Sequence, residues 1–321
     1  MTERLVLGAD IGGTAVKYVL GGAGDPDRYA GEIPTHAGDV LDTFVRLAAT
    51  VADLLPRGVA PAAAGLACAG IVDPVRGRLG RAPNLPGWEN RDLAAALREA
   101  FGDIRGVFAN DVNAALAGEA RFGAGRGCRD LVMLALGTGV GGAVMVDGRL
   151  VTGTRHGAGE IGHMVLDPDG PLCGCGNRGC LEAYAGSLGL LAEARRRAAG
   201  PDATPALRDL VEVRGADLST RDLSTLALAG DAATEALFQD TGRMLGVAVG
   251  NLVNVLDPEK VIVGGGVAQA GELLLSPCRL EAASLILCVA SRDTPVEPAE
   301  LGPHAAALGA ARLARDALEA A

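Results

Sequence analysis

Two stretches of the sequence share a pattern of an apolar strand, a glycine-rich turn and a second strand. They are RLVLGADIGGTAVKYVL at residues 4–20 and LVMLALGTGVGGAVMVDGR at residues 131–149. In both stretches an apolar segment resumes directly after the glycines, so each is predicted to form a β-hairpin rather than a strand that leads into a helix. The hairpins lie about 125 residues apart, and each opens one half of the chain. This spacing predicts a duplicated α/β fold.

Glycine turns of this kind suit the close approach of a phosphate, because no Cβ atoms obstruct their backbone N–H groups. Asp10 lies at the mouth of the first turn, where a carboxylate could hold Mg²⁺ beside phosphate oxygens. The alternative is an ordinary hairpin turn in which Asp10 is only a turn residue. The run Gly137–Gly142 matches the dinucleotide pattern G-x-G-x-x-G, but that motif requires a helix after the glycines. The P-loop pattern is absent from the sequence, so the two turns favour a nucleotide clamped between the halves.

The stretch from Gly157 to Glu182 is a second constraint, because it holds three of the seven cysteines and one of the four histidines. Its His163, Cys173, Cys175 and Cys180 form a set of one imidazole and three thiols, which suits tetrahedral zinc. Glycines alternate with the cysteines and allow the chain to fold tightly around one ion. The alternative is a glycine-rich loop whose thiols are reduced and bind no metal.

The sequence NDVN at residues 110–113 stands between a short predicted strand at 106–109 and a predicted helix. Asn110 or Asp111 is expected to cap that helix, where a polar side chain meets the positive end of the helix dipole. The tip of a strand also suits Asp111 as an ionised general base. The two interpretations are compatible.

Apolar periodicity organises most of the remaining chain. It predicts helices at 39–56, 92–101, 187–198, 206–213, from 219, at 232–256 and from 303 onward, and strands at 61–71 and 260–263. A proline-bounded loop at 82–88 carries Asn84, which is either a substrate contact or an ordinary turn residue. Gly264 and Gly265 follow a strand and could let an adenine or ribose lie against the backbone, although a plain strand-to-helix turn is the alternative.

Composition limits the partners of the chain. With Lys+Arg 29 against Asp+Glu 39, the net charge of −10 argues against a nucleic-acid partner, because binding to a phosphate backbone needs clustered cations. No apolar run is long enough to span a bilayer or to form a signal peptide, so we expect a cytoplasmic location and no membrane partner. In that reducing location clustered cysteines more often bind metal than form disulfides. The isolated cysteines are expected to be buried thiols: Cys68, Cys128, Cys278 and Cys288.

Five motifs together resemble the ROK family of repressors, open reading frames and sugar kinases. They are DIGGT at 10–14, LGTGVGG at 136–142, EIGH at 160–163, CGCGNRGCLE at 173–182 and VGGG at 263–266. The cysteine motif is the most specific of them, because all actin-like and hexokinase-like ATPases share the glycine hairpins. The resemblance runs from residue 5 to about residue 315. It implies a duplicated actin-like or hexokinase-like ATPase fold (ribonuclease H-like) with two α/β domains and a central cleft.

The resemblance also implies an activity, the transfer of a phosphoryl group from ATP with Mg²⁺ to the 6-hydroxyl of a hexose. Asp111 corresponds to the base that takes the hydroxyl proton, and the sugar ligands correspond to Asn84, Asn110, Asp111, Glu160, His163 and Glu182. The ligands of a structural Zn²⁺ correspond to His163, Cys173, Cys175 and Cys180. The expected nucleotide and magnesium positions are Asp10, Gly12, Gly13, Thr14, Gly137, Thr138, Gly139, Gly141, Gly264 and Gly265. Ala15 departs from the lysine of many members, and no catalytic role is assigned to Lys17 two residues later.

Glucose is the expected acceptor, with N-acetylglucosamine, mannose or fructose as alternatives. A sugar-responsive regulator is less expected, because family repressors carry an N-terminal helix-turn-helix and this chain begins shortly before its first strand. An actin-like ATPase without a sugar substrate would leave the cysteine motif unexplained. We expect a small domain of residues 1–113 with 302–321, a large domain of residues 114–301, and a homodimer.

Overall fold

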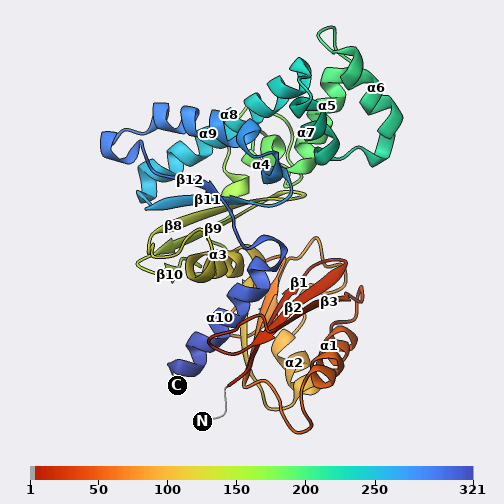
Figure 1. Ribbon diagram of the computed structural model, residues 1–321, viewed down its shortest axis with the longest axis vertical. Helices are drawn as coiled ribbons and strands as arrows, with labels where there is room; N and C mark the ends of the chain where they lie inside the picture. Colours follow the sequence, from red (N-terminus) through yellow and green to blue (C-terminus); the bar gives the residue numbers. More distant parts are fainter. Residues whose placement is uncertain (1–3, 321) are drawn as a thin grey trace. The chain divides into compact units, whose positions relative to one another are not determined.

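The computed structural model describes residues 4–320 and divides them into two compact units (Figure 1). Unit 1 comprises the described residues up to Gly127, the segment Leu150–Ala158 and the residues from Glu300. Unit 2 comprises Cys128–Arg149 and Gly159–Ala299. The expected division after residue 113 differs from these units, because α3 (Asp111–Phe122) packs against α10 (Ala305–Glu319) within unit 1.

A five-stranded sheet in the order β3-β2-β1-β4-β7 forms the centre of unit 1. Its strands are β1 (Val6–Ile11), β2 (Ala15–Gly21), β3 (Tyr29–Pro34), β4 (Ala63–Cys68) and β7 (Arg105–Asn110), and a separate small hairpin consists of β5 (Val72–Asp73) and β6 (Arg78–Leu79). β1 and β2 form the first predicted hairpin, in which Asp10 lies opposite Lys17. β1, β4 and β7 are parallel, so their carboxyl ends share one edge of the sheet.

Helices cover both faces of this sheet. α1 (Val40–Leu54) and α2 (Leu93–Phe101) share a core with Leu7, Ala9 and Ile11 of β1. The alternate residues of β1 point to the opposite face, where α10 packs. A Cβ atom at Gly8 would overlap the carbonyl oxygen of Ala307, and one at Gly65 of β4 would overlap that of Ala310. The two glycines therefore let the helix backbone lie directly on the strands.

Gly65→Ala is expected to lower the free energy of unfolding by about 1–3 kcal/mol, because α10 must shift to accommodate the added methyl group. Urea denaturation measures this change. The matched control is Gly24→Ala in the same unit, because the added Cβ meets nothing within 4 Å and the backbone there does not require a positive φ. Equal effects of the two substitutions would contradict this account of the packing.

Unit 2 contains a second five-stranded sheet in the order β10-β9-β8-β11-β12. Its strands are β8 (Leu131–Leu136), β9 (Val140–Val146), β10 (Arg149–Leu150), β11 (Lys260–Gly264) and β12 (Val296–Pro298). β8 and β9 form the second predicted hairpin, and β11 runs parallel to β8. Both sheets thus combine a glycine hairpin with a neighbouring parallel strand, which confirms the predicted duplicated α/β fold.

The remaining helical segments were mostly predicted from periodicity and caps. They are α4 (Leu181–Ala185), α5 (Ser187–Ala198), α6 (Pro205–Arg214), α7 (Thr220–Leu228), α8 (Ala232–Leu256), α9 (Glu272–Leu285) and the short η1 (Ile161–His163), η2 (Gly215–Asp217), η3 (Val267–Ala270), η4 (Val289–Ser291) and η5 (Gly302–His304). Ser219 starts α7 through a capping box with Asp222, and Thr204 caps α6 just before Pro205. These polar side chains satisfy N–H groups that have no partner inside the helix.

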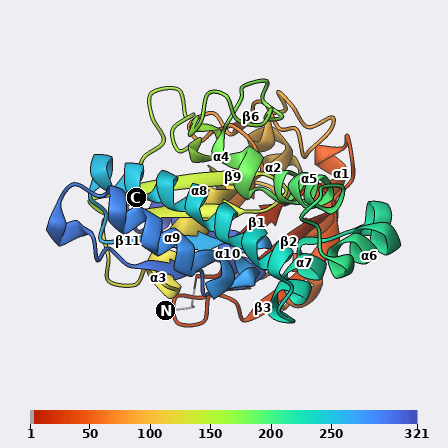
Figure 2. The same ribbon diagram turned by 90° about the horizontal axis from the view of Figure 1, so that it is seen from above.

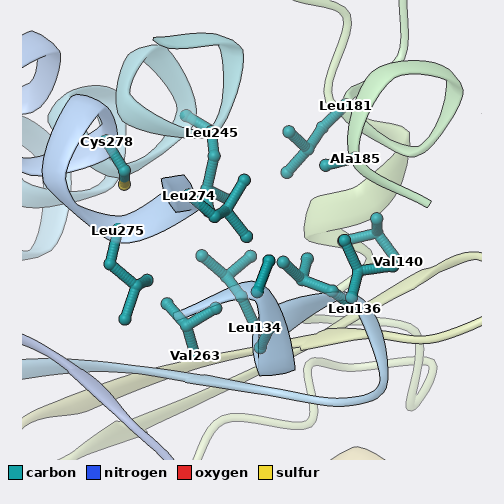
Figure 3. Close-up of a cluster of buried hydrophobic side chains, with 14 of the residues drawn as sticks. Leu134, Leu136, Val140, Leu181, Ala185, Leu245, Val263, Leu274, Leu275 and Cys278 are labelled. Atoms are coloured by element: carbon teal, nitrogen blue, oxygen red, sulfur yellow. The ribbon is translucent and has the colours of Figure 1, made fainter. Parts of the chain in front are cut away.

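α8 and α9 pack against each other, and both views show them side by side over the sheet of unit 2 (Figures 1 and 2). Figure 3 shows the apolar core beneath them, to which the sheet, α4, α8 and α9 all contribute. Leu181 and Ala185 of α4 lie in this core near Val140, the first residue of β9 (Figure 3). The core therefore fixes α4, and with it the cysteine segment that precedes α4, against the second hairpin.

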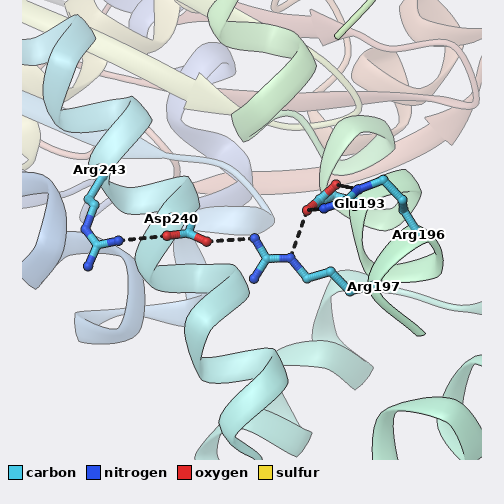
Figure 4. A network of polar contacts seen from close by, with 5 residues as sticks. All are labelled: Glu193, Arg196, Arg197, Asp240 and Arg243. Carbon is cyan, nitrogen blue, oxygen red and sulfur yellow. Dashed lines mark hydrogen bonds and ion pairs between the residues drawn. The ribbon is translucent and has the colours of Figure 1, made fainter. Parts of the chain in front are cut away.

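A polar network at the surface joins α5 to α8 (Figure 4). The Arg197 guanidinium donates to Glu193 at 2.8 Å within α5 and to Asp240 of α8 at 2.7 Å. Arg196 and Arg243 donate to the same two carboxylates. The hydrogen bonds from Arg196 and Arg197 hold the pKa of Glu193 below its usual value, so the carboxylate stays ionised at neutral pH.

Some sequence expectations need correction. Cys68 and Cys278 are buried as expected, but Cys288 is exposed and Cys128 is only half-buried, because both lie in loops near the ends of secondary structure. The edge strands β3 and β12 and the hairpin of β5 and β6 were not predicted. Among residues 4–320, no helix combines the length and apolarity needed to cross a membrane.

Candidate functional site

Two carboxylates meet at the carboxyl edge of the sheet in unit 1. Asp10 is near the end of β1, and Asp111 is the first residue of α3, directly after β7. Burial and the negative charge of Asp10 raise the pKa of Asp111 to about 6. Burial, and to a lesser extent the two carboxylates, also raise the pKa of the Cys68 thiol at the end of β4, the strand between them. The structure therefore brings together the predicted base and the predicted magnesium ligand.

The pKa of Asp10 responds to groups on two other elements. Burial raises this pKa, while electrostatic interactions with Lys17 and His304 oppose the rise. Lys17 is the cross-strand partner of Asp10 in β2, and His304 ends η5 just before α10. His304 was missed in the sequence, where no local motif surrounds it.

Of the two residues expected to cap α3, Asn110 is the N-cap. Its Oδ1 accepts hydrogen bonds from the N–H groups of Val112 at 2.9 Å and Asn113 at 3.1 Å. Its Nδ2 donates to Asp111 Oδ1 at 2.8 Å and to the carbonyl oxygen of Gly70 at 3.1 Å. The cap thus places Asp111 at the positive end of the helix dipole.

The first glycine turn lies against the loop that carries Asn84. A Cβ atom at Gly13 would overlap the carbonyl oxygen of Asn84, so only glycine allows this approach. The exposed Gly13 and Thr14 form the tip of the turn. Trp88 anchors the loop, because its ring is fully buried against Phe44 and its Nε1 donates to the carbonyl oxygen of His36 at 3.1 Å. Asn84 itself is exposed beside the turn.

The second and third glycine turns of the chain lie together in unit 2. Gly137 closes its turn by donating to the carbonyl oxygen of Gly139 at 2.9 Å, and Thr138 at the tip is exposed. Gly265 follows β11 with a φ of +93°, and a Cβ atom there would overlap the carbonyl oxygen of Leu136. Because β8 and β11 are parallel, both turns lie at the carboxyl edge of the sheet, which is where α/β sheets bind ligands.

Glu182 connects the second turn to the cysteine segment. Its Oε2 accepts from the N–H of Val140 at 3.1 Å, and its Oε1 accepts from Cys173 Sγ at 3.3 Å. A Cβ atom at Gly139 would overlap the same carboxylate. Ser187 at the start of α5 also donates to the carbonyl oxygen of Gly137 at 2.9 Å. The sequence motif identified Glu182 but gave no sign of its bond to Val140.

The four predicted metal ligands form one cluster. The ligand atoms of His163, Cys173, Cys175 and Cys180 all lie within 4.8 Å of one another. Cys175 Sγ and Cys180 Sγ are 3.7 Å apart, and Cys173 Sγ is 3.8 Å from His163 Nδ1. Tetrahedral zinc with bonds of about 2.3 Å to sulfur separates its ligands by about 3.8 Å, so this donor set fits Zn²⁺. A closed set of four protein ligands suits a structural ion rather than a catalytic one.

The loop with Glu160 lies beside this cluster. Glu160 precedes η1, which ends at His163, and its side chain is exposed. A Cβ atom at Gly162 would overlap the carbonyl oxygen of Val140, so η1 lies tightly on β9. His163 directs Nδ1 to the cluster. That orientation leaves Nε2 on the opposite side of the imidazole ring.

The chain is similar to known proteins over nearly its whole length. The family model described as ROK family matches residues 6–317. A glucokinase of Streptomyces coelicolor is 33% identical over 319 residues, which cover 97% of this chain and 98% of that protein. A kanosamine kinase of Amycolatopsis mediterranei is 31% identical, with 96% of this chain and 95% of that protein covered. The crystal structure of a ROK family glucokinase from Streptomyces griseus in complex with glucose and AMPPNP matches with a TM-score of 0.80 and 33% identity, covering 97% of this chain and 99% of that one.

The fold and the site together define the structural class of this protein. Two α/β units, each with the glycine turn of a central hairpin at the carboxyl edge of its sheet, constitute the actin-like or hexokinase-like ATPase fold. Within that class the cysteine and histidine cluster and the match over nearly the whole length are specific, and the chain belongs to the ROK family.

Proposed function

We propose that this chain is an ATP-dependent hexose kinase that phosphorylates the 6-hydroxyl of glucose. The observation that carries the proposal is the position and the raised pKa of Asp111. Its carboxylate lies at the tip of β7, and its pKa is raised to about 6. A base with this pKa is ionised at neutral pH and still accepts a proton more readily than an ordinary carboxylate. The 33% identity to a glucokinase over 97% of the chain supports glucose as the acceptor.

Unit 1 would supply the base and part of the phosphate site. Asp111 accepts the proton of the 6-hydroxyl as the oxygen attacks the γ-phosphorus of ATP, and ADP leaves. Gly12 closes the turn by donating its N–H to the carbonyl oxygen of Ala15 at 3.0 Å, and the backbone N–H groups at Gly13 and Thr14 would donate to phosphate oxygens. Asp10 suits Mg²⁺, because a half-buried carboxylate beside a phosphate turn is a typical donor for this ion. Magnesium, when bound with ATP, compensates negative charge on the phosphates.

Unit 2 would supply sugar ligands and the rest of the nucleotide site. Glu160, Glu182 and His163 Nε2 are proposed to bind sugar hydroxyls, together with Asn84 of unit 1, because hydroxyls both donate and accept hydrogen bonds. The turns with Gly137, Thr138, Gly139 and Gly141 and with Gly264 and Gly265 are proposed to hold the nucleotide. A Zn²⁺ ion held by His163, Cys173, Cys175 and Cys180 would fix this loop without taking part in the chemistry.

The acceptor is identified by an ATP-consumption assay with glucose, mannose, fructose, N-acetylglucosamine and kanosamine. We expect the highest kcat/KM with glucose and formation of the 6-phosphate, detected by ³¹P NMR. The control is Asp111→Asn, which should consume ATP at least about 10²-fold more slowly with every sugar. If no sugar accelerates ATP consumption by the unmodified chain, the kinase proposal is wrong.

Kanosamine, an amino sugar, is the second candidate acceptor. The 31% identity to a kanosamine kinase over 96% of the chain is nearly as high as the identity to the glucokinase. The same assay separates the two candidates through the ratio of their kcat/KM values, since an acceptor is selected by differential binding in the transition state. If kcat/KM is higher for kanosamine than for glucose, kanosamine becomes the proposed acceptor, and the proposed kinase chemistry is unchanged.

A further inference from the structure

The Glu119 side chain of α3 is fully buried, although no step of the proposed chemistry uses it. It lies in the last turn of the helix, where a carboxylate meets the negative end of the helix dipole. Burial of a carboxylate also costs free energy unless hydrogen bonds replace those made with water. Both effects oppose a glutamate at this position, which indicates that contacts with other parts of the chain account for it.

Three backbone N–H groups bind this carboxylate. Oε2 accepts from the N–H of Ala124 at 2.8 Å and from that of Glu300 at 3.2 Å. Oε1 accepts from the N–H of Leu301 at 2.9 Å. All three partners are donors, so they suit a carboxylate, whose oxygens only accept. A Cβ atom at Gly123 would overlap Oε2, so glycine lets the chain turn closely around the side chain.

The two segments that Glu119 binds lie next to connections between the units. The chain first leaves unit 1 at residues 127–128, the first connection, and returns to it for the last time at residues 299–300, the last connection. The first connection begins three residues after Ala124, and the last connection ends at Glu300, whose own N–H binds the carboxylate. One side chain therefore ties the segments beside both connections to the end of α3.

The opposite end of α3 carries the proposed base, because Asp111 is the first residue of this helix. The helix itself is firmly placed in unit 1. α3 packs against α10, and a Cβ atom at Gly309 of α10 would overlap the carbonyl oxygen of Ala114. The two helix backbones are thus in direct contact. A single well-packed helix therefore carries the base at its beginning and holds the two connections at its end.

We propose that Glu119 is a positioning residue that fixes the first and the last connection to the helix of the base. The inference rests on the proposed kinase function, in which phosphoryl transfer needs groups of both units. The rate of such a transfer depends steeply on alignment, since a misplacement of about 1 Å can cost about 10²-fold. Binding tolerates such a misplacement better. Glu119 thus governs the rate of transfer more than the affinity for sugar.

The test is Glu119→Gln, because the amide keeps the shape of the side chain but turns its NH₂ group toward at least one N–H donor. At a temperature at which circular dichroism shows the variant to be folded, we expect kcat to fall about 10- to 100-fold. The dissociation constant for glucose from calorimetry should rise less than about threefold. The matched control is Glu300→Gln, the same change at an exposed side chain that pairs with Arg126 at 3.8 Å. It leaves the backbone N–H in place and should keep kcat within about twofold.

Amide hydrogen exchange, followed by mass spectrometry, tests the two connections without turnover. In Glu119→Gln the peptides that contain residues 124 and 300–301 should exchange at least about tenfold faster than in the unmodified chain. Gly123→Ala, whose Cβ atom displaces the same carboxylate but leaves its charge, should give the same result, so the test does not depend on one variant.

Unchanged exchange at these segments would overturn the proposal, as would a dissociation constant for glucose raised tenfold or more with kcat unchanged. Faster exchange in a chain that phosphorylates no sugar would support the role of Glu119 at the connections and contradict only the kinase function. The two failures are therefore recognised separately.

Discussion

Asp111→Asn is expected to lower kcat by about 10²–10⁴-fold and at the same time to stabilise the folded protein above pH 6. The loss of activity follows because an amide cannot take the hydroxyl proton. Sugar binding should survive, because the Oδ1 of an asparagine can still accept from Asn110 and from the N–H of Val112. The kinetic effect is measured as ATP consumption and the binding as a dissociation constant from calorimetry.

The gain in stability follows from proton linkage. The folded state raises the pKa of Asp111 from 3.8 to about 6, so it binds this proton more tightly than the unfolded chain does. The resulting stabilisation is complete below about pH 3.8 and is lost as the pH rises through about 6. Above that pH the ionised carboxylate costs up to about 3 kcal/mol relative to a group without this shift, and asparagine avoids that cost.

Chemical denaturation at pH 5 and pH 7.5 distinguishes this linkage from a general effect of the substitution. We expect the stability gain of Asp111→Asn over the unmodified chain to be about 1–2 kcal/mol larger at pH 7.5 than at pH 5, because the native carboxyl is still mostly protonated at pH 5. A difference that does not depend on pH would show that the raised pKa is not its cause. If the Asp111→Asn variant keeps its activity, Asp111 is not the catalytic base.

Local patterns predicted the parts of the site that are close in sequence. The hairpins β1–β2 and β8–β9 follow from apolar runs around glycines, and the cap of α3 follows from Asn110 before a helical period. The cluster of His163 with the three cysteines was also predicted, because metal ligands carry a residue type and a spacing that remain visible in the sequence.

Contacts between residues that are far apart in the sequence could not be predicted from local patterns. The carbonyl of Gly70 reaches Asn110 across 40 positions, and the N–H of Val140 reaches Glu182 across 42. His304 comes to Asp10 only because α10 returns to the sheet of unit 1. β3 was missed because its residues alternate between half-buried and exposed, so it lacks the apolar run that marked the central strands.

Cys175→Ala is expected to abolish zinc binding and to raise the sugar dissociation constant at least about tenfold, with a much smaller effect on ATP. Three ligands remain, but the ion loses its closed tetrahedral set. Without the ion, the segment that carries Glu160, His163 and Glu182 loses its cross-link. Metal content per chain measured by mass spectrometry and calorimetric titration with sugar test the two effects.

The nucleotide turn should be less affected, because other bonds hold it. Gly137 donates to the carbonyl oxygen of Gly139, and Ser187 donates to that of Gly137, and neither bond involves a cluster residue. We therefore expect the dissociation constant for a non-hydrolysable ATP analogue to change by less than about threefold, in contrast to the sugar. The bond from Val140 to Glu182 is a path by which loss of the ion would reach this turn.

Cys288→Ala is the matched control, because Cys288 is also exposed and in the same unit but lies outside the cluster. This variant should keep its zinc and its affinity for sugar, which separates the loss of the ion from the loss of a surface thiol. A zinc-free Cys175→Ala variant with unchanged sugar affinity would show that the loop is rigid without the ion. In that case the packing of Gly162 on β9 and the core contacts of Leu181 and Ala185 would suffice to position the proposed sugar ligands.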